Sequence, residues 1–200
     1  MHILGLTGGI GMGKSTAAAA FRRAGARVFD ADAEVHRLQS PGGTALPLIG
    51  AAFPGTVHRD AQGRRVLDRA TLRTRALAQP QALPRLEAIL HPLVRQAERA
   101  FLARAHRAGA RLVVLDVPLL FETGLDRQAD TVVVVSAPRA VQIARVRQRG
   151  RMDAGQILAV IARQMPDAEK RRRADVVVRT GLSRHHAQRA IRRLIRRLLA

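Results

Sequence analysis

The glycine-rich run at residues 8–15 constrains the fold of this chain more than any other part of its sequence. It reads Gly-Gly-Ile-Gly-Met-Gly-Lys-Ser and matches the pattern G-x-x-x-x-G-K-[ST]. A short apolar segment at 2–7 precedes it, and an alanine-rich segment at 16–24, ended by Gly25, follows it. The flanks favour a buried strand and a helix. We therefore predict strand, tight loop and helix in that order, and not a glycine-rich turn beside a chance lysine.

A loop of this kind holds a nucleoside triphosphate for a physical reason. Glycines lack a Cβ, so backbone N–H groups can converge on phosphate oxygens, and the following helix directs the positive end of its dipole at the same anion. In this pattern Lys14 reaches the β- and γ-phosphates, and the hydroxyl of Ser15 ligates Mg²⁺.

Composition narrows the class of protein further. Two hundred residues fit one domain, or one core with insertions, and the absence of cysteine excludes disulfides and thiolate metal sites. We see no signal peptide and no apolar stretch long enough to span a membrane, so we expect a cytoplasmic enzyme.

The formal net charge of +20 is nearly all arginine, because only Lys14 and Lys170 are lysines. Arginine and alanine are plentiful along the whole chain, which indicates compositional bias more than a nucleic-acid surface. Aromatic residues make up only 2% of the chain, so platforms for base stacking are scarce. An arginine-rich nucleic-acid-binding protein is the non-enzyme alternative, and it predicts steeply salt-dependent binding that ATP does not affect.

Strand-like and helical patterns alternate along the chain, which is typical of an α/β fold with a parallel sheet of about five strands covered by helices. After 2–7, the apolar or β-branched runs that predict strands are 26–29, 111–118, 131–135 and 176–178. Helices are expected at 16–24, 33–39, 44–53, 138–149, 153–164 and 183–200, the last capped by Ser183. The apolar face of that last helix suits packing on the sheet, with membrane or partner binding as the alternative.

Residues 33–107 contain no convincing strand and suggest a helical insertion between the second and third strands. Within it, residues 56–66 are polar and indicate a turn or an exposed hairpin. Pro80, Pro84 and Pro92 mark expected breaks or starts of helices.

Acidic residues follow two of the predicted strands. Asp30 and Asp32 come after the second strand, and Asp116 ends the apolar run before Pro118. Ligands of open α/β sheets bind outside the carboxyl ends of the strands, where a carboxylate can take a proton from an attacking hydroxyl or help to hold Mg²⁺. The alternatives are a turn residue and a helix N-cap at 30 and 32, and a turn residue at 116.

Arginines crowd the end of one predicted helix, at 145, 147, 149 and 151. Arginine suits phosphoryl transfer because it stays charged and donates to phosphate with two N–H groups, so a mobile segment carrying it would act as a lid. A solvated basic face is the alternative. His36 and His91 suit structural roles, and His185 and His186 lack a third ligand for zinc.

Taken together, these motifs resemble the dephospho-CoA kinase family, which belongs to the P-loop kinase group. The resemblance covers almost the whole chain in order, and Asp-Ala-Asp, His-Pro-Leu and Val-Pro-Leu-Leu-Phe-Glu make it specific. The matching stretches are 6–16, 30–32 with His36, Asp60 and Gly63, 67–69 with Leu72, 90–93, 116–122, Arg145 and Arg149, 163–164, 174–175 and 180–181.

The resemblance implies a single P-loop kinase domain that uses ATP and Mg²⁺ to phosphorylate the ribose 3′-hydroxyl of dephospho-CoA, the last step of coenzyme A biosynthesis. By position, Asp32 is the general base, Arg145 and Arg149 neutralise charge on the transferred group, and Arg69 and His91 contact or support dephospho-CoA. The implied parts are a core at 1–32, 108–138 and 166–200, an acceptor-binding insertion at 33–107 and a lid at 139–165. The implied ATP-binding residues are Gly9, Ile10, Gly11, Met12, Gly13, Lys14, Ser15 and Thr16, with Ser15 on the metal.

Two positions depart from the family pattern. Met12 stands where serine is usual, and we expect little effect because the loop acts through its backbone. Arg179-Thr180 replaces the usual asparagine before Gly181. A P-loop kinase for another small hydroxyl substrate, such as a nucleoside or nucleotide, is the enzyme alternative, whereas a GTPase lacks support because no N-K-x-D signature occurs. We expect a monomer or a weak homo-oligomer, and neither nucleic acid nor membrane as a partner.

Overall fold

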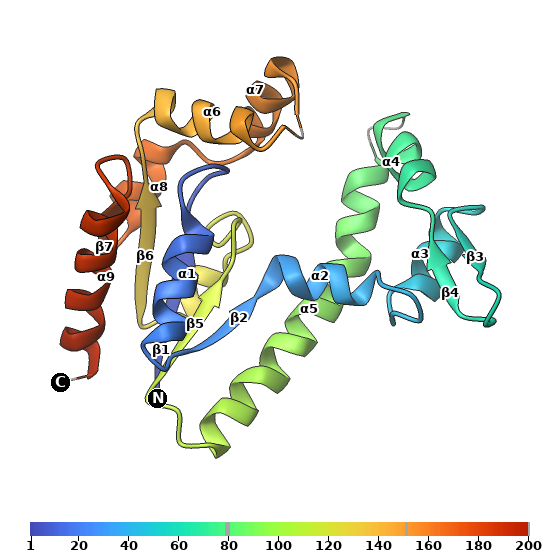
Figure 1. Cartoon of the computed structure of the whole chain (residues 1–200). Helices are drawn as coiled ribbons and strands as arrows, with labels where there is room; N and C mark the ends of the chain where they lie inside the picture. Colours follow the sequence, from blue (N-terminus) through green and yellow to red (C-terminus); the bar gives the residue numbers. More distant parts are fainter. Residues whose placement is uncertain (79–80, 151, 200) are drawn as a thin grey trace. The chain divides into compact units, whose positions relative to one another are not determined.

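The computed structural model describes residues 1–78, 81–150 and 152–199 (Figure 1). Pro80, Arg151 and Ala200 lie outside the described residues. The chain forms two compact units, one of Met1–Asp30 with Arg104–Ala200 and one of Ala31–Ala103. Within the described ranges, no helix is both long and apolar enough to cross a bilayer.

The first unit is built on a five-stranded sheet in the order β2-β5-β1-β6-β7, and every strand pair in it is parallel. The prediction of a parallel five-stranded α/β sheet is confirmed. Residues on β5 and β6 are buried throughout, as expected for β-branched runs in the interior of a sheet covered on both faces. The strands are β1 (His2–Thr7), β2 (Arg27–Asp30), β5 (Leu112–Asp116), β6 (Thr131–Ser136) and β7 (Val176–Arg179).

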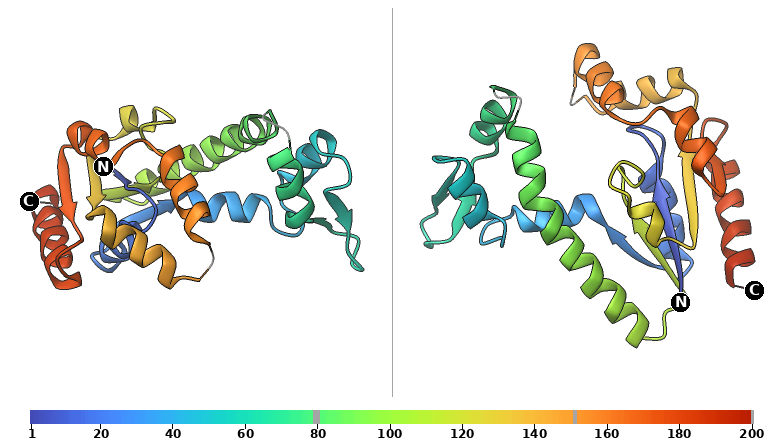
Figure 2. Two further views of the ribbon diagram at one scale, coloured as in Figure 1. Left: turned by 90° about the horizontal axis from the view of Figure 1, so that it is seen from above. Right: turned by 180° about the vertical axis from the view of Figure 1, so that it is seen from behind.

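The helices of the first unit divide by position. Figures 1 and 2 show that α6, α7 and α8 gather at the edge where the strands end, whereas α1 and α9 run alongside the sheet. Ala187, Ile191 and Leu194 of α9 are buried in the same core as the sheet, so the prediction that this helix packs on the sheet is confirmed. These helices are α1 (Lys14–Arg23), η1 (Leu125–Gln128, a 3-10 helix), α6 (Arg139–Gln148), α7 (Ala154–Arg163), α8 (Asp167–Arg173) and α9 (Arg184–Leu199).

The second unit has its own apolar core, to which Leu38, Leu46, Ile49, Phe53 and Leu90 contribute. Its last helix continues into the first unit as far as Arg107. Its elements are α2 (Ala31–Leu38), α3 (Leu46–Ala52), β3 (Val57–Arg59), β4 (Arg65–Leu67), α4 (Arg69–Ala78) and α5 (Ala82–Arg107).

Two expectations for residues 33–107 were wrong. The stretch does contain strands, because β3 and β4 pair antiparallel from Val57 opposite Leu67 to Arg59 opposite Arg65, as the hairpin reading of 56–66 had it. Pro92 lies inside α5 and does not end it. A proline removes one backbone hydrogen bond, but apolar side chains on both sides of Pro92 pack into one core, and that packing outweighs the local loss. Pro84, by contrast, stands in the first turn, where no N–H partner is needed.

Helix α8 was missed by the sequence analysis. It has no apolar periodicity, and its helical signal is one of charge: Asp167 and Glu169 open it after Pro166, and Arg171 to Arg173 close it. This order of charges complements the helix dipole.

Candidate active site

The glycine-rich loop joins β1 to α1, and its glycines are there for space and conformation. A Cβ on Gly8 would lie 2.6 Å from the carbonyl oxygen of Val135, so only glycine allows the loop to pass β6 this closely. Gly11 and Gly13 have φ values of 75° and 93°, in the left-handed region that disfavours side chains. The predicted strand, loop and helix are confirmed.

The loop turns the opening amides of α1 toward one place. Ala17 is the first amide to bond back, to the carbonyl oxygen of Gly13 at 3.1 Å. The amides of Lys14, Ser15 and Thr16 precede it and have no acceptor inside the helix, because the first N–H groups of any α-helix lack one. An anion placed there meets these donors and the helix dipole together.

Lys14 and Asp116 form a close ion pair at the mouth of the loop. The Nζ of Lys14 lies 2.7 Å from Oδ1 of Asp116, whose side chain is only 3% exposed. Asp116 stands at the end of β5, level with Leu6 on β1 and with Asp30 on β2. The register therefore places the carboxylate beside the loop, which fits an acid that positions the loop lysine.

The middle of the loop is held from outside by two glutamines. The N–H of Ile10 donates to Oε1 of Gln164 at 3.0 Å, and the carbonyl oxygen of Ile10 accepts from Nε2 of Gln142 at 2.9 Å. Gln142 lies on α6, and Gln164 directly follows α7. Sequence reasoning assigned no role to either residue, since only contact with the backbone of the loop reveals one.

Met12 does more than the sequence analysis expected. Its side chain is 3% exposed within the main core, and its sulfur accepts a hydrogen bond from the N–H of Ala137 at 3.0 Å. The expectation of little effect considered only the backbone of the loop, whereas the thioether fills space between the loop and the end of β6.

Arg145 bridges the loop and the segment after β7. Its guanidinium donates to the carbonyl oxygen and the hydroxyl of Thr180 at 2.7 and 3.2 Å, and Thr180 donates to the carbonyl oxygen of Met12 at 2.6 Å. Arg149 is exposed at the end of α6, and both arginines line a cavity of about 320 Å³ with Gly11, Gly13 and Thr16. The structure thus brings the two predicted arginines to the loop.

The remaining predicted site residues lie in the second unit. Asp32 is exposed in the first turn of α2, directly after β2 in the chain. Arg69 is exposed at the start of α4, and its guanidinium lies 3.2 Å from Nδ1 of His36. His91 is exposed within α5. The roles of these residues toward an acceptor stay predictions.

An ion pair between a buried lysine and a partly exposed glutamate lies next to the segment that follows α7. The Nζ of Lys170, whose side chain is 1% exposed, lies 2.9 Å from Oε1 of Glu122. Burial acts to raise the pKa of Glu122, but hydrogen bonds from the N–H of Met165 and from Lys170 outweigh it and hold the pKa below its ordinary value. The carboxylate is therefore charged at neutral pH.

A parallel sheet of this order, whose central strand runs into such a loop, defines a P-loop nucleotide-binding protein. The fold is shared with the dephospho-CoA kinase from Campylobacter jejuni, at a TM-score of 0.72 and 22% identity over 98% of this chain and 96% of that one. The crystal structure of TT1252 from Thermus thermophilus is similar at a TM-score of 0.83 and 35% identity, covering 100% of this chain and 98% of that one.

Sequence comparison identifies the branch of this class. A family model described as dephospho-CoA kinase matches residues 2–185. The dephospho-CoA kinase of Gluconobacter oxydans is 53% identical over 99% of this chain and 98% of its own length. The chain therefore belongs to the dephospho-CoA kinase family, which confirms the resemblance read from its motifs.

Proposed function

We propose that this protein transfers the γ-phosphoryl group of ATP to the ribose 3′-hydroxyl of dephospho-CoA, forming CoA and ADP. The observation that carries the proposal is the phosphate loop, with Lys14 held 2.7 Å from the buried Asp116, in a chain of this family. Phosphoryl transfer needs little covalent chemistry from the protein, so positioning and electrostatic stabilisation do most of the work.

The donor half of the reaction rests on the loop. The amides that open α1 bind the phosphate oxygens, and Lys14 stabilises charge on the β- and γ-phosphates. Asp116 limits the movement of the Lys14 ammonium, so less reorganisation is needed as charge develops.

The residues beside Lys14 also suit Mg²⁺. Mg²⁺ prefers oxygen ligands and binds in kinases through one or two protein groups, several waters and the substrate phosphates. Ser15 supplies a hydroxyl on the first turn of α1, and Asp116 supplies a carboxylate near the same turn. These two residues would hold the metal, which supplies charge neutralisation between the phosphates.

The acceptor half rests on the second unit in this proposal. Asp32 takes the proton from the ribose 3′-hydroxyl as that oxygen attacks the γ-phosphorus. Arg69 and His91 contact or support dephospho-CoA, and residues 33–107 form its binding region.

Residues 139–165 act as a lid. Arg145 and Arg149 neutralise charge on the transferred group, and closure excludes water so that ATP is not hydrolysed. The contacts of Arg145 with Thr180 place its guanidinium beside the loop, which supports this role.

The deciding experiment is an assay of CoA formation from dephospho-CoA and Mg-ATP by the purified protein. Formation of CoA and ADP in equal amounts is expected, and no CoA at any pH or Mg²⁺ concentration would remove the proposal. A panel of nucleosides and nucleotides as acceptors tests the alternative, a P-loop kinase for another small hydroxyl substrate.

We further propose that the protein is cytoplasmic and is a monomer or a weak homo-oligomer. Fractionation of cells tests the location, and light scattering on the purified protein tests the oligomeric state.

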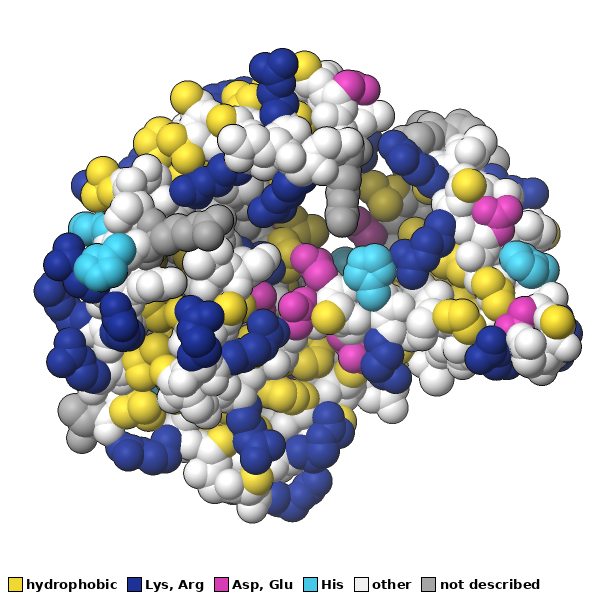
Figure 3. Space-filling view, in the orientation of Figure 1, with side chains coloured by type: hydrophobic (Ala, Val, Ile, Leu, Met, Phe, Trp, Pro, Cys, Tyr) yellow, Lys and Arg dark blue, Asp and Glu magenta, His cyan; other side chains and the backbone are white. Residues whose placement is uncertain are grey.

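One observation bears on the nucleic-acid alternative. On the face seen in Figure 3, Lys and Arg side chains are dispersed, mainly with apolar and other uncharged side chains between them. A nucleic-acid surface usually gathers its basic residues in one patch or stripe. The dispersal supports the kinase proposal, and weak DNA and RNA binding at physiological salt is expected.

A further inference from the structure

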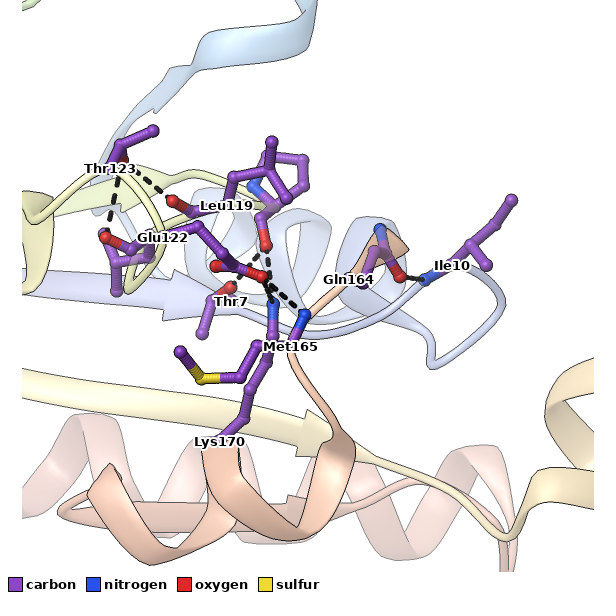
Figure 4. Close-up of polar contacts among 10 residues, drawn as sticks. Thr7, Ile10, Leu119, Glu122, Thr123, Gln164, Met165 and Lys170 are labelled. Carbon is purple, nitrogen blue, oxygen red and sulfur yellow. Dashed lines mark hydrogen bonds and ion pairs between the residues drawn. The ribbon is translucent and has the colours of Figure 1, made fainter. Parts of the chain in front are cut away.

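A ring of hydrogen bonds links the residue before the phosphate loop to the polypeptide after α7 (Figure 4). The hydroxyl of Thr7 donates to the carbonyl oxygen of Pro118 at 2.9 Å, and Nζ of Lys170 donates to the same oxygen at 3.0 Å. Lys170 also pairs with Glu122, which accepts the N–H of Met165 at 2.9 Å. Each of these contacts fixes the backbone next to the loop or next to Gln164.

Gln164 connects this ring of hydrogen bonds to the phosphate loop itself. It directly precedes Met165, and its Oε1 accepts the N–H of Ile10 at 3.0 Å. Gln142 donates to the carbonyl oxygen of the same residue, Ile10, at 2.9 Å. Both polar backbone groups of Ile10 are thereby bonded to side chains of the segment 139–165.

We propose that Gln164 is a positioning residue for the phosphate loop, and that the pair of Glu122 and Lys170 acts through it. By holding Ile10, Gln164 keeps the loop in the conformation in which the amides at the start of α1 converge on the triphosphate. The inference deepens the proposed function and rests on it for its kinetic consequences, whereas its consequences for nucleotide binding do not depend on the acceptor.

The expected loss of nucleotide affinity follows from the preorganisation of the phosphate loop. A loop that has lost its anchor populates other conformations, and the apparent affinity for nucleotide falls by the fraction of molecules that remain competent. Loss of one partly buried hydrogen bond of this kind corresponds to about a tenfold change. The effect should fall on the nucleotide and not on dephospho-CoA.

Gln164→Met tests the proposal directly, because methionine keeps the length of the side chain and removes the acceptor. Gln164 lines a cavity of about 860 Å³, so the replacement does not disturb a closed core. We expect Kd for Mg-ADP by calorimetry to rise about tenfold, with KM for ATP following and KM for dephospho-CoA changing less than about twofold. Gln164→Glu retains an acceptor and should lie between the wild type and the methionine variant.

A matched control exists at the other end of α7. Gln156 is exposed and closes the capping box with Asp153, so Gln156→Met removes a hydrogen bond of similar chemistry without touching the loop. It should leave Kd for Mg-ADP within about twofold of the wild type. An equal loss in both variants would mean that Gln164 acts only through the stability of α7, and an unchanged or tighter Kd in Gln164→Met would overturn the proposal.

Two further measurements test the positioning role of Gln164 independently of the proposed kinase activity. The amide of Ile10 should exchange with solvent at least about tenfold faster in Gln164→Met than in the wild type, whatever the acceptor is. Glu122→Gln should weaken Mg-ADP binding about threefold alone and less than twofold when added to Gln164→Met. Unchanged exchange or additive losses would overturn the coupling, whereas absence of CoA formation by an otherwise normal wild type would remove only the kinase assignment.

Discussion

The two units of the chain hold their candidate functional side chains in different ways. In the first unit, Lys14, Arg145 and Gln164 each bond to a partner that fixes them beside the phosphate loop. In the second unit, Asp32 and His91 are exposed, and Arg69 has one contact with the exposed His36. In terms of the proposed function, the residues assigned to the nucleotide are held by contacts within the fold, whereas those assigned to the acceptor are exposed. Variants in each half should therefore fail in different ways.

The largest effect is expected for Asp32→Asn. Asp32 is the general base in the proposed function, and loss of such a base lowers kcat by about 10²–10⁴-fold. Binding of ATP should change by less than about threefold, because the loop amides and Lys14 are untouched. Steady-state kinetics and calorimetry with Mg-ADP measure the two quantities.

The control for Asp32→Asn is Glu34→Gln on the same helix. Glu34 pairs with Arg37 in α2, and its loss should leave kcat near the wild-type value. If Asp32→Asn abolishes nucleotide binding instead, the carboxylate acts on the nucleotide, and the proposed assignment of Asp32 to the acceptor is wrong.

Lys14→Ala is expected to lower kcat almost as much as Asp32→Asn, but by affecting the nucleotide and not the acceptor. In the proposed function Lys14 stabilises charge on the phosphates, and removal of such a preorganised charge costs about 10²–10³-fold in kcat. The side chain of Asp116 also loses the ammonium beside it, so thermal melting should show lower stability as well. A variant that turned over near the wild-type rate would exclude Lys14 from the mechanism.

Arg145 on α6 and Arg149 at its C-terminal end offer a comparison within one segment. Arg145→Ala removes bonds to Thr180 and should cost about 1.5–3 kcal/mol of stability while raising KM for ATP. Arg149→Ala removes an exposed side chain and should change stability by less than about 0.5 kcal/mol while still lowering kcat. Chemical denaturation with kinetics separates the two. Equal stability losses would show that both arginines serve the fold.

Much of the first unit could be predicted from the sequence because its signals are local. Continuous β-branched runs such as 131–135 indicate interior strands, and the glycine pattern at 8–15 requires a loop before a helix. Ser183 could be named as a cap from its position, and its hydroxyl accepts the N–H of His186 at 3.0 Å.

The supports of the site could not be predicted, because they join residues far apart in the chain. Gln164 and Ile10 are 154 positions apart, and nothing near either one indicates the other. Met12 was misjudged for the same reason, since the N–H that its sulfur accepts belongs to Ala137, 125 positions away. The prediction for Pro92 was wrong because it considered the local cost of a proline inside a helix without the core that α5 packs against.

The smallest expected effect concerns a side chain of the second unit that is buried, unlike the candidate functional side chains of that unit. Glu98 on α5 is 1% exposed, and among the described residues its Oε2 has no hydrogen-bond partner. Burial raises the pKa of Glu98 above its ordinary value of 4.5, although Arg95 and Arg99 act to lower it. The native carboxyl thus binds a proton more tightly than the unfolded chain does, and its ionisation destabilises the fold as pH rises from 4.5 through the raised pKa.

Glu98→Gln should therefore raise the melting temperature at neutral pH, by about 2–4 °C for each kcal/mol gained in a chain of this length. The gain should shrink as pH falls toward 4.5, where the wild-type carboxyl is itself protonated in the folded state. Glu87→Gln on the same helix is the control for removing a negative charge, and calorimetry at several pH values measures both. A gain that did not depend on pH would mean that folding does not raise the pKa of Glu98, and that the gain has a cause other than the buried carboxyl group.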